Sequence, residues 1–165
     1  MTNKTKHSTL NSLPTSILHT TALLFFTFSL FPQTAERLEW LLEQERVSYA
    51  QAALFVLEAA EHIAPSEQLS PDDAFSYAQE NNLLPANVQE NYAVNLKGLS
   101  FLVMQAFDIK GGVFYSITKS QHHAYRELVH RSIIQGRADP LMYINGDQLL
   151  FTINRALQLT GNNEK

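Results

Sequence analysis

The sequence contains an internal repeat, which limits the folds open to this chain. Residues 74–109 align without gaps with residues 124–159, at a constant offset of 50 positions. Five of the 36 aligned positions are identical and seven more keep an apolar residue, and these matches fall at helical spacing in two blocks. Such a repeat indicates one supersecondary unit used several times, because a single unit cannot bury its apolar face alone. The identical pairs are Ala74/Ala124, Asn95/Asn145, Leu99/Leu149, Phe101/Phe151 and Ala106/Ala156.

A third copy of the unit lies upstream. Residues 47–60 align with residues 94–107, and residues 35–42 supply a helical stretch that ends in a Leu-Leu pair. The other two copies hold a similar pair, Leu83-Leu84 and Ile133-Ile134. The sequence therefore predicts an all-α fold of three helix–loop–helix repeats, which cover about residues 36–63, 70–110 and 120–159.

Each repeat carries a short polar residue just before its second helix. Ser48, Asn95 and Asn145 occupy this place, where a side-chain oxygen accepts a hydrogen bond from a free helix N–H. The second helices are expected near residues 49–62, 96–108 and 146–159, with these three residues as their N-caps.

The third repeat resembles an S-layer homology repeat. In that family the first helix ends in Ile-Ile and a polar-Gly exit, as in residues 133–136 here. The second helix opens Ile-Thr-Arg-Ala-Glu and closes Arg-Ala-Leu-Gly-Leu, similar to residues 144–148 and 155–159. The resemblance covers residues 36–159. It implies a helical bundle with pseudo-threefold symmetry, and a non-catalytic domain that anchors proteins to cell-wall glycans.

The chain departs from the family at the charged positions. The family's Arg position holds Tyr49, Leu96 and Gly146, and its Glu position holds Gln51, Gly98 and Gln148. In the family the arginine lies in grooves between repeats and attracts an acidic wall polymer. Its replacement leaves three alternatives open, namely a neutral or anionic envelope glycan, another envelope protein, and a scaffold with empty grooves.

The resemblance also points to candidate contact residues, because the cap and loop positions form the family's grooves. We expect Lys97 and Arg137 to matter most for an anionic ligand. The candidate ligand-binding residues are Tyr49, Asn95, Lys97, Arg137 and Asn145.

Residues 1–35 have the pattern of a secretory signal. Lys4 and Lys6 are the only charges before Glu36, and an apolar run extends from Ile17 to Phe31. As a helix this run spans about 22 Å, short of the roughly 30 Å of a bilayer core. We expect cleavage after Ala35, which leaves residues 36–165 in the periplasm or cell envelope; the alternative is an uncleaved membrane anchor.

Composition excludes several classes of protein. The chain has no cysteine, so it forms neither a disulfide framework nor a cysteine zinc site. Its 12 basic and 16 acidic residues give a net charge of −4, without the basic stripe of a nucleic-acid binder. No nucleic-acid partner, catalytic set or cofactor is expected.

One group of side chains is compatible with an enzyme. His123, Glu127 and His130 recur at i, i+4 and i+7, so one helix face can present two imidazoles and a carboxylate. Such a set can hold zinc with an open position for water, which makes a metal-dependent hydrolase the alternative function. A solvated helix face is the simpler interpretation. Elsewhere, Trp40 is expected in the core, and Phe114-Tyr115 are expected to pack over the junction between repeats.

Overall fold

A computed structural model describes residues 31–63, 69–136 and 138–161 of the chain. These residues form seven helices and no strand, which confirms the all-α prediction. The helices are α2 (Phe31–Leu42), α3 (Tyr49–Ala59), α4 (Pro71–Glu80), α5 (Leu96–Ala106), α6 (Val113–Thr118), α7 (Gln121–His130) and α8 (Gly146–Gly161).

The chain divides into two units, residues 1–39 and residues 40–165. The described part of the first unit is the beginning of α2, which runs across Ala35, the expected cleavage position. Most of the expected signal segment, residues 1–30, lies outside the described residues. No helix in the described ranges combines the length and apolar character needed to cross a membrane.

The offset of 50 residues reappears in the helices of the second unit. α4 and α7 differ by this offset at both ends, and α5 and α8 start 50 residues apart. The turns that follow α4 and α7 each contain a residue with positive φ, Asn82 at 56° and Ser132 at 59°. The predicted starts of the three second helices are therefore correct, whereas the expected ends differ by two or three residues.

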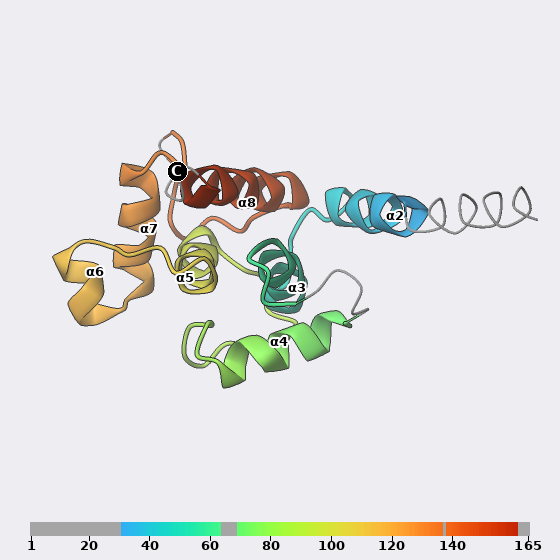
Figure 1. Cartoon of the computed structure of the whole chain (residues 1–165), viewed down its shortest axis with the longest axis horizontal. Helices are drawn as coiled ribbons and strands as arrows, with labels where there is room; N and C mark the ends of the chain where they lie inside the picture. Colours follow the sequence, from blue (N-terminus) through green and yellow to red (C-terminus); the bar gives the residue numbers. More distant parts are fainter. Residues whose placement is uncertain (1–30, 64–68, 137, 162–165) are drawn as a thin grey trace, which may run out of the picture. The chain divides into compact units, whose positions relative to one another are not determined.

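Helices α3, α5 and α8, which we call the central helices, form the centre of this unit. α3, α5 and α8 contact one another, while α4 packs on α3 and α7 packs on α5 (Figure 1). Each central helix turns the same two positions inward, four residues apart and on one helix face. These buried residues are Ala52 and Val56, Leu99 and Val103, and Leu149 and Ile153.

A closed ring of backbone hydrogen bonds joins the segments that precede the central helices. The N–H of Val94 donates to the carbonyl of Val47 at 2.8 Å, and that of Val47 donates to Ile144 at 3.0 Å. The N–H of Ile144 closes the ring by donating to Val94 at 3.2 Å. All three side chains are fully buried, so these backbone groups need protein partners and find them in one another.

The first N–H of each central helix is satisfied by a carbonyl group from a distant loop of the same unit. Tyr49 donates to the carbonyl of Tyr92, and Leu96 donates to that of Met142. Gly146 donates in turn to the carbonyl of Gln44. Because the first N–H groups of a helix have no partner within it, these bonds fix where each helix begins relative to the loop that accepts the bond.

Two burial predictions are wrong in part. Trp40 is 40% exposed, and its neighbour Leu41 is fully buried instead. Tyr115 is buried as expected, but Phe114 is 74% exposed. Both corrections have one cause: neighbouring residues of a helix point about 100° apart, so a helix with one packed face buries one of them.

Candidate functional site

The three expected caps are formed, and each uses its side-chain oxygen. Ser48 Oγ accepts from the Gln51 N–H at 3.2 Å, and Asn95 Oδ1 accepts from the Gly98 N–H at 2.9 Å. Asn145 Oδ1 accepts from the Gln148 N–H at 2.9 Å. The cap oxygens of Asn95 and Asn145 are therefore already engaged, which limits what they offer a ligand.

The residues at the family's Glu position have a structural role here. Gln51 Oε1 accepts from the Ser48 N–H at 2.8 Å, and Gln148 Oε1 accepts from the Asn145 N–H at 3.1 Å. These reciprocal bonds complete capping boxes, for which a neutral amide serves as well as a carboxylate. Gly98, at the same position of the second repeat, cannot make this bond.

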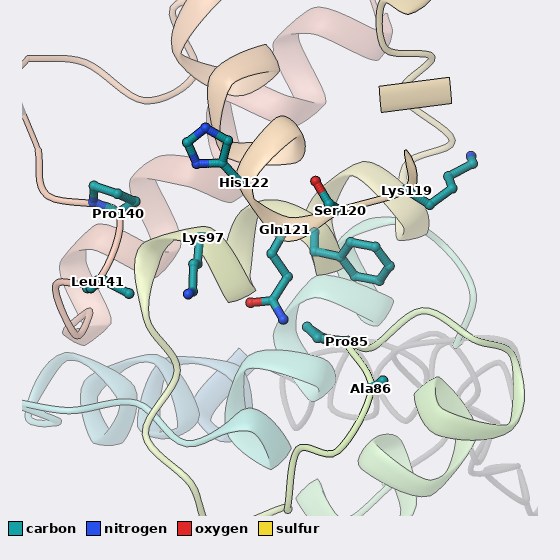
Figure 2. A pocket seen from close by; sticks show the side chains of 10 residues that line it. Pro85, Ala86, Lys97, Lys119, Ser120, Gln121, His122, Pro140 and Leu141 are labelled. Carbon is teal, nitrogen blue, oxygen red and sulfur yellow. The ribbon is translucent and has the colours of Figure 1, made fainter. Parts of the chain in front are cut away.

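Two cavities open beside the start of α5. The first, of about 520 Å³, brings together three of the expected contact residues, Tyr49, Asn95 and Lys97. The second, of about 560 Å³, lies between the Pro85-Ala86 loop and the Pro140-Leu141 loop (Figure 2). Both cavities are lined by Lys97 and Gln121, and we call the pair of them the Lys97 groove.

The Lys97 groove has a positive lining in an acidic chain. Lys97 and Lys119 line it, and none of the lining residues in the described chain is an aspartate or glutamate. The chain as a whole carries a net charge of −4. Figure 2 shows Lys97 and Gln121 extending into the same opening, so an ammonium group and an amide face any ligand there together.

Tyr49 and Gly98 fit each other across two repeats. The Tyr49 hydroxyl occupies the space where a side chain at position 98 would begin. The Tyr49 side chain is 5% exposed, and this burial raises its pKa to about 12. Tyr49 and Gly98 differ from the arginine and glutamate of the S-layer homology pattern, and here they form one packing contact.

Two tyrosines at the mouth of the groove were missed by the sequence argument. Tyr92 and Tyr143 line the first cavity, and each is half exposed. The Arg46 guanidinium lies 5.0 Å from the centre of the Tyr143 ring, within cation–π range. The available signal was a tyrosine shortly before the cap, three residues before Asn95 and two residues before Asn145. Gln121 gave none, because its place in the groove depends on how α7 packs on α5.

The other expected contact residues are not part of this groove. Asn145 lines neither of the two cavities. Arg137 lies outside the described residues.

The expected metal-binding side chains make local hydrogen bonds. His123 Nδ1 lies 2.8 Å from Thr118 Oγ1 and 2.9 Å from Ser120 Oγ, and Glu127 Oε1 accepts from the Gly112 N–H at 2.8 Å. His130 is exposed in the last turn of α7. Within the described ranges, no three histidine, aspartate or glutamate side chains lie close enough together to hold one metal ion. The hydrolase alternative stays a prediction.

Comparison with protein-family models finds no family that matches the chain, and comparisons with curated proteins and with solved structures find no match either. The geometry described above is therefore the basis for the function proposed below.

Proposed function

We propose that this chain is a non-catalytic envelope module, similar to an S-layer homology domain, that binds an anionic envelope glycan in the Lys97 groove. The observation that carries the proposal is the lining of the Lys97 groove. The described residues that line it include lysine, amide and tyrosine side chains and no carboxylate. An ammonium group attracts a carboxylate or phosphate on the glycan, while amides and hydroxyls bond to its hydroxyl groups.

The architecture in this proposal is three repeats about a pseudo-threefold axis. It is supported by the closed ring of hydrogen bonds among Val47, Val94 and Ile144, in which each repeat donates once and accepts once. It is also supported by the mutual contacts of α3, α5 and α8. On this arrangement the groove lies between loops of different repeats, and Lys97 of α5 stands beside the cap position, which the resemblance assigns to the family's grooves.

In this proposal Lys97 takes over the role of the family's arginine from a neighbouring position. It follows the Arg position of the second repeat, Leu96, by one residue. Its backbone N–H donates to the Pro140 carbonyl at 2.9 Å, which ties the first turn of α5 to the loop on the other side of the groove. Its side chain then extends into the groove, as Figure 2 shows.

Export is part of the proposal. It is supported by Lys4 and Lys6 followed by the apolar run from Ile17 to Phe31. The intact mass of the protein from the envelope fraction of its native host tests this part. A full-length protein confined to the cytosol would contradict it.

Retention on purified cell-wall material tests the binding. At low salt, the native protein should sediment with cell wall that keeps its anionic polymer and less with wall stripped of it. Lys97→Ala should weaken retention by about three- to tenfold, and Lys97→Arg should restore most of it, because one charge-assisted contact contributes about 1 kcal/mol. Added salt should reduce the difference between the variants.

Lys110→Ala is the matched control, since it removes the same charge from an exposed position outside the groove. Its retention on wall should equal that of the native protein. If Lys97→Ala binds wall as well as the native protein at low salt, the Lys97 groove is not the binding surface. Retention by an envelope protein and not by wall would favour the other partner class.

A further inference from the structure

The start of α8 holds an Asn-Gly dipeptide, Asn145-Gly146, and no other asparagine of the chain is followed by glycine. An asparagine in this context is chemically labile, because glycine has no Cβ to hinder attack by its own backbone nitrogen on the asparagine side chain. Asn95, the equivalent cap of the second repeat, is followed by leucine. The two caps therefore make the same hydrogen bond but differ in chemical stability.

Packing explains why the labile pair stands at this position. Asn145 is needed as a cap, since its Oδ1 accepts from the Gln148 N–H at 2.9 Å. Gly146 is needed because a Cβ there would overlap the backbone carbonyl oxygen of Leu41. The fold thus combines a helix cap with a close approach of two backbones, and together these two requirements create the reactive sequence.

We propose that Asn145 is a site of spontaneous deamidation that is controlled by opening of the start of α8. The backbone nitrogen of Gly146 attacks Cγ of Asn145 and forms an N–Cγ bond. The Cγ–Nδ2 bond breaks, and ammonia leaves with the proton from the attacking nitrogen. Water then opens the cyclic imide. Addition at Cγ gives aspartate, and addition at the backbone carbonyl carbon of Asn145 gives isoaspartate, in which the chain runs through the side chain.

The folded start of α8 opposes this reaction. The Gly146 N–H donates to the Gln44 carbonyl at 3.1 Å, and the Asn145 N–H donates to Gln148 Oε1 at 3.1 Å. The imide nitrogen carries no hydrogen, so the bond to Gln44 has to break before the ring closes. The Asn145 side chain also has to leave the Gln148 N–H. The reaction rate therefore depends on how often the start of α8 separates from residues 41–44.

The two products differ in their effect on the fold. Aspartate caps a helix as well as asparagine does, and its charge suits a helix N-terminus. Isoaspartate instead adds one carbon to the backbone between Ile144 and Gly146. The Ile144 N–H donates to the Val94 carbonyl at 3.2 Å, and the Gly146 N–H donates to Gln44. A longer backbone cannot return both groups to their partners, so the ring of hydrogen bonds that joins the repeats opens.

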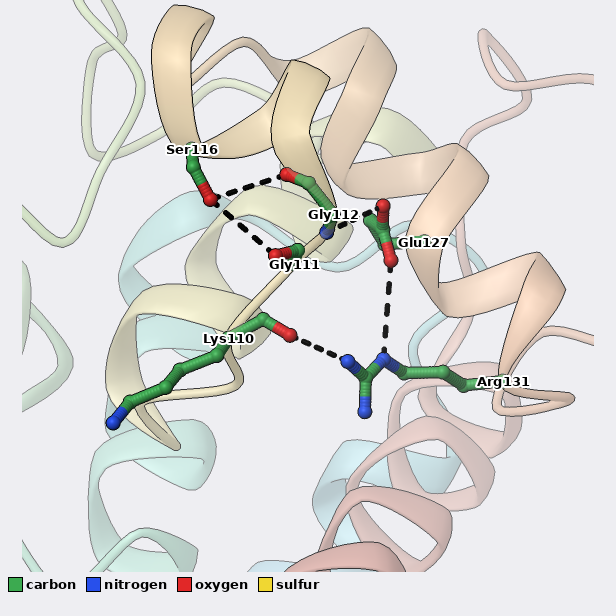
Figure 3. Close-up of polar contacts among 6 residues, drawn as sticks. All are labelled: Lys110, Gly111, Gly112, Ser116, Glu127 and Arg131. Carbon is green, nitrogen blue, oxygen red and sulfur yellow. Dashed lines mark hydrogen bonds and ion pairs between the residues drawn. The ribbon is translucent and has the colours of Figure 1, made fainter.

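The junction between the second and third repeats is held by different groups. Glu127 Oε1 accepts from the Gly112 N–H at 2.8 Å, and the Arg131 guanidinium donates to the Lys110 carbonyl (Figure 3). Residues 110–131 contain no asparagine. We therefore expect deamidation to accumulate at the start of α8 and not at this junction.

Peptide mapping by mass spectrometry tests the proposal. The full-length protein is incubated at mildly alkaline pH, either folded or unfolded in urea, and the peptide that contains Asn145 is followed with time. In urea Asn145 should convert to a mixture of aspartate and isoaspartate. In the folded protein the reaction should run at no more than about a tenth of that rate, because it waits for local opening. Asn95 should react far more slowly than Asn145 in the unfolded chain, since leucine follows it.

Two matched variants test whether the start of α8 controls the rate. Gln148→Ala removes the bond from the Asn145 N–H and keeps the Asn-Gly sequence. It should raise the rate in the folded protein about threefold to tenfold, because one hydrogen bond fewer opposes opening. Gln51→Ala removes the corresponding bond of the first repeat, from the Ser48 N–H, and should leave the rate unchanged. In urea the native protein and both variants should react equally fast.

The products give an independent test. Asn145→Asp should keep the thermal unfolding midpoint of the native protein, whereas aged protein purified in its isoaspartate form should unfold at a lower temperature. Three results would overturn the proposal. The first is an Asn145 that reacts no faster than Asn95 in urea, and the second is an equal rate of reaction in folded and unfolded protein. The third is a folded Gln148→Ala variant that reacts no faster than Gln51→Ala.

Discussion

Helices α5 and α8 hold the same place in successive repeats, yet their outward faces differ. Phe101 of α5 is 8% exposed, and Phe151, the identical residue 50 positions later, is 63% exposed. The equivalent Leu54 of α3 is 3% exposed. α3 and α5 are each covered by the first helix of the following repeat, α4 and α7. Identity between repeats therefore specifies the inward face of a helix, whereas burial of the outward face depends on which element packs over it.

Replacement of the two phenylalanines should produce the largest contrast. Phe101→Ala removes a buried ring and leaves a cavity, at a cost of about 3–5 kcal/mol in the free energy of unfolding. Phe151→Ala acts on an exposed ring and should cost less than about 1 kcal/mol. Urea unfolding of the two variants measures both values. Equal losses would mean that Phe151 is covered in solution, and the contrast between α5 and α8 would fail.

The first residue of the central helix is a second point of difference. A Cβ at Gly146 would overlap the carbonyl oxygen of Leu41, whereas α3 and α5 hold Tyr49 and Leu96 at this place. The overlapping atom belongs to the backbone and cannot rotate away. Gly146→Ala should therefore destabilise the protein by about 1–3 kcal/mol.

Gly161→Ala is the matched control for that variant. It lies at the end of the same helix, and a Cβ there would meet nothing within 4 Å. It should leave the free energy of unfolding unchanged or raise it slightly. A Gly146→Ala variant as stable as Gly161→Ala would show that the loop at Leu41 yields without cost, so that the start of α8 is no more constrained than that of α5.

The features that the sequence predicted are local ones. Ser48, Asn95 and Asn145 were identified as caps because a cap depends on a hydrogen bond to the N–H three residues ahead, which the sequence contains. The repeat offset likewise gave the starts of the central helices.

The features that the sequence did not predict depend on packing between elements. Helix α6 lies in a stretch that was expected only as a junction, and Phe114 was expected to be covered. Of the groove, Tyr49, Asn95 and Lys97 were expected, but Gln121 and Tyr143 come from other elements brought alongside α5. The hydrophobic pattern of one segment does not predict which distant loop will pack against it.

Replacement of each of the three caps should cost a similar free energy of unfolding. Equal costs would mean that α5 and α8 differ in the burial of their outward faces and not in how they begin. Ser48→Ala, Asn95→Ala and Asn145→Ala should each lower the free energy of unfolding by about 1 kcal/mol, because each leaves a helix N–H without its partner. Asn154→Ala, an exposed change on α8, is the control and should be close to neutral. If Asn95→Ala lowers the free energy of unfolding and Asn145→Ala does not, the Asn145 cap does not stabilise the start of α8.

The smallest effect concerns the first residue of α3, where the first repeat differs from the other two by carrying an ionisable group. Burial raises the pKa of Tyr49 from 10 to about 12, so the folded protein resists its ionisation more than the unfolded chain does. The stability that depends on neutral Tyr49 is therefore fully present below pH 10 and is lost as the pH rises from 10 to 12. Leu96 and Gly146, at the same place in the other repeats, contribute no such dependence.

Tyr49→Phe should accordingly lose less stability than the native protein between pH 7 and pH 11, by at most about 1 kcal/mol, in urea unfolding at the two pH values. Burial also raises the pKa of Tyr115 to about 12, so Tyr115→Phe should show a reduction of similar size. Tyr92→Phe, a change at a half-exposed ring, controls for the loss of a phenol as such. If native protein and Tyr49→Phe lose equal stability over this range, the Tyr49 hydroxyl is not enclosed against Gly98. The first turn of α3 would then stand as open to solvent as the mouth of the groove beside it.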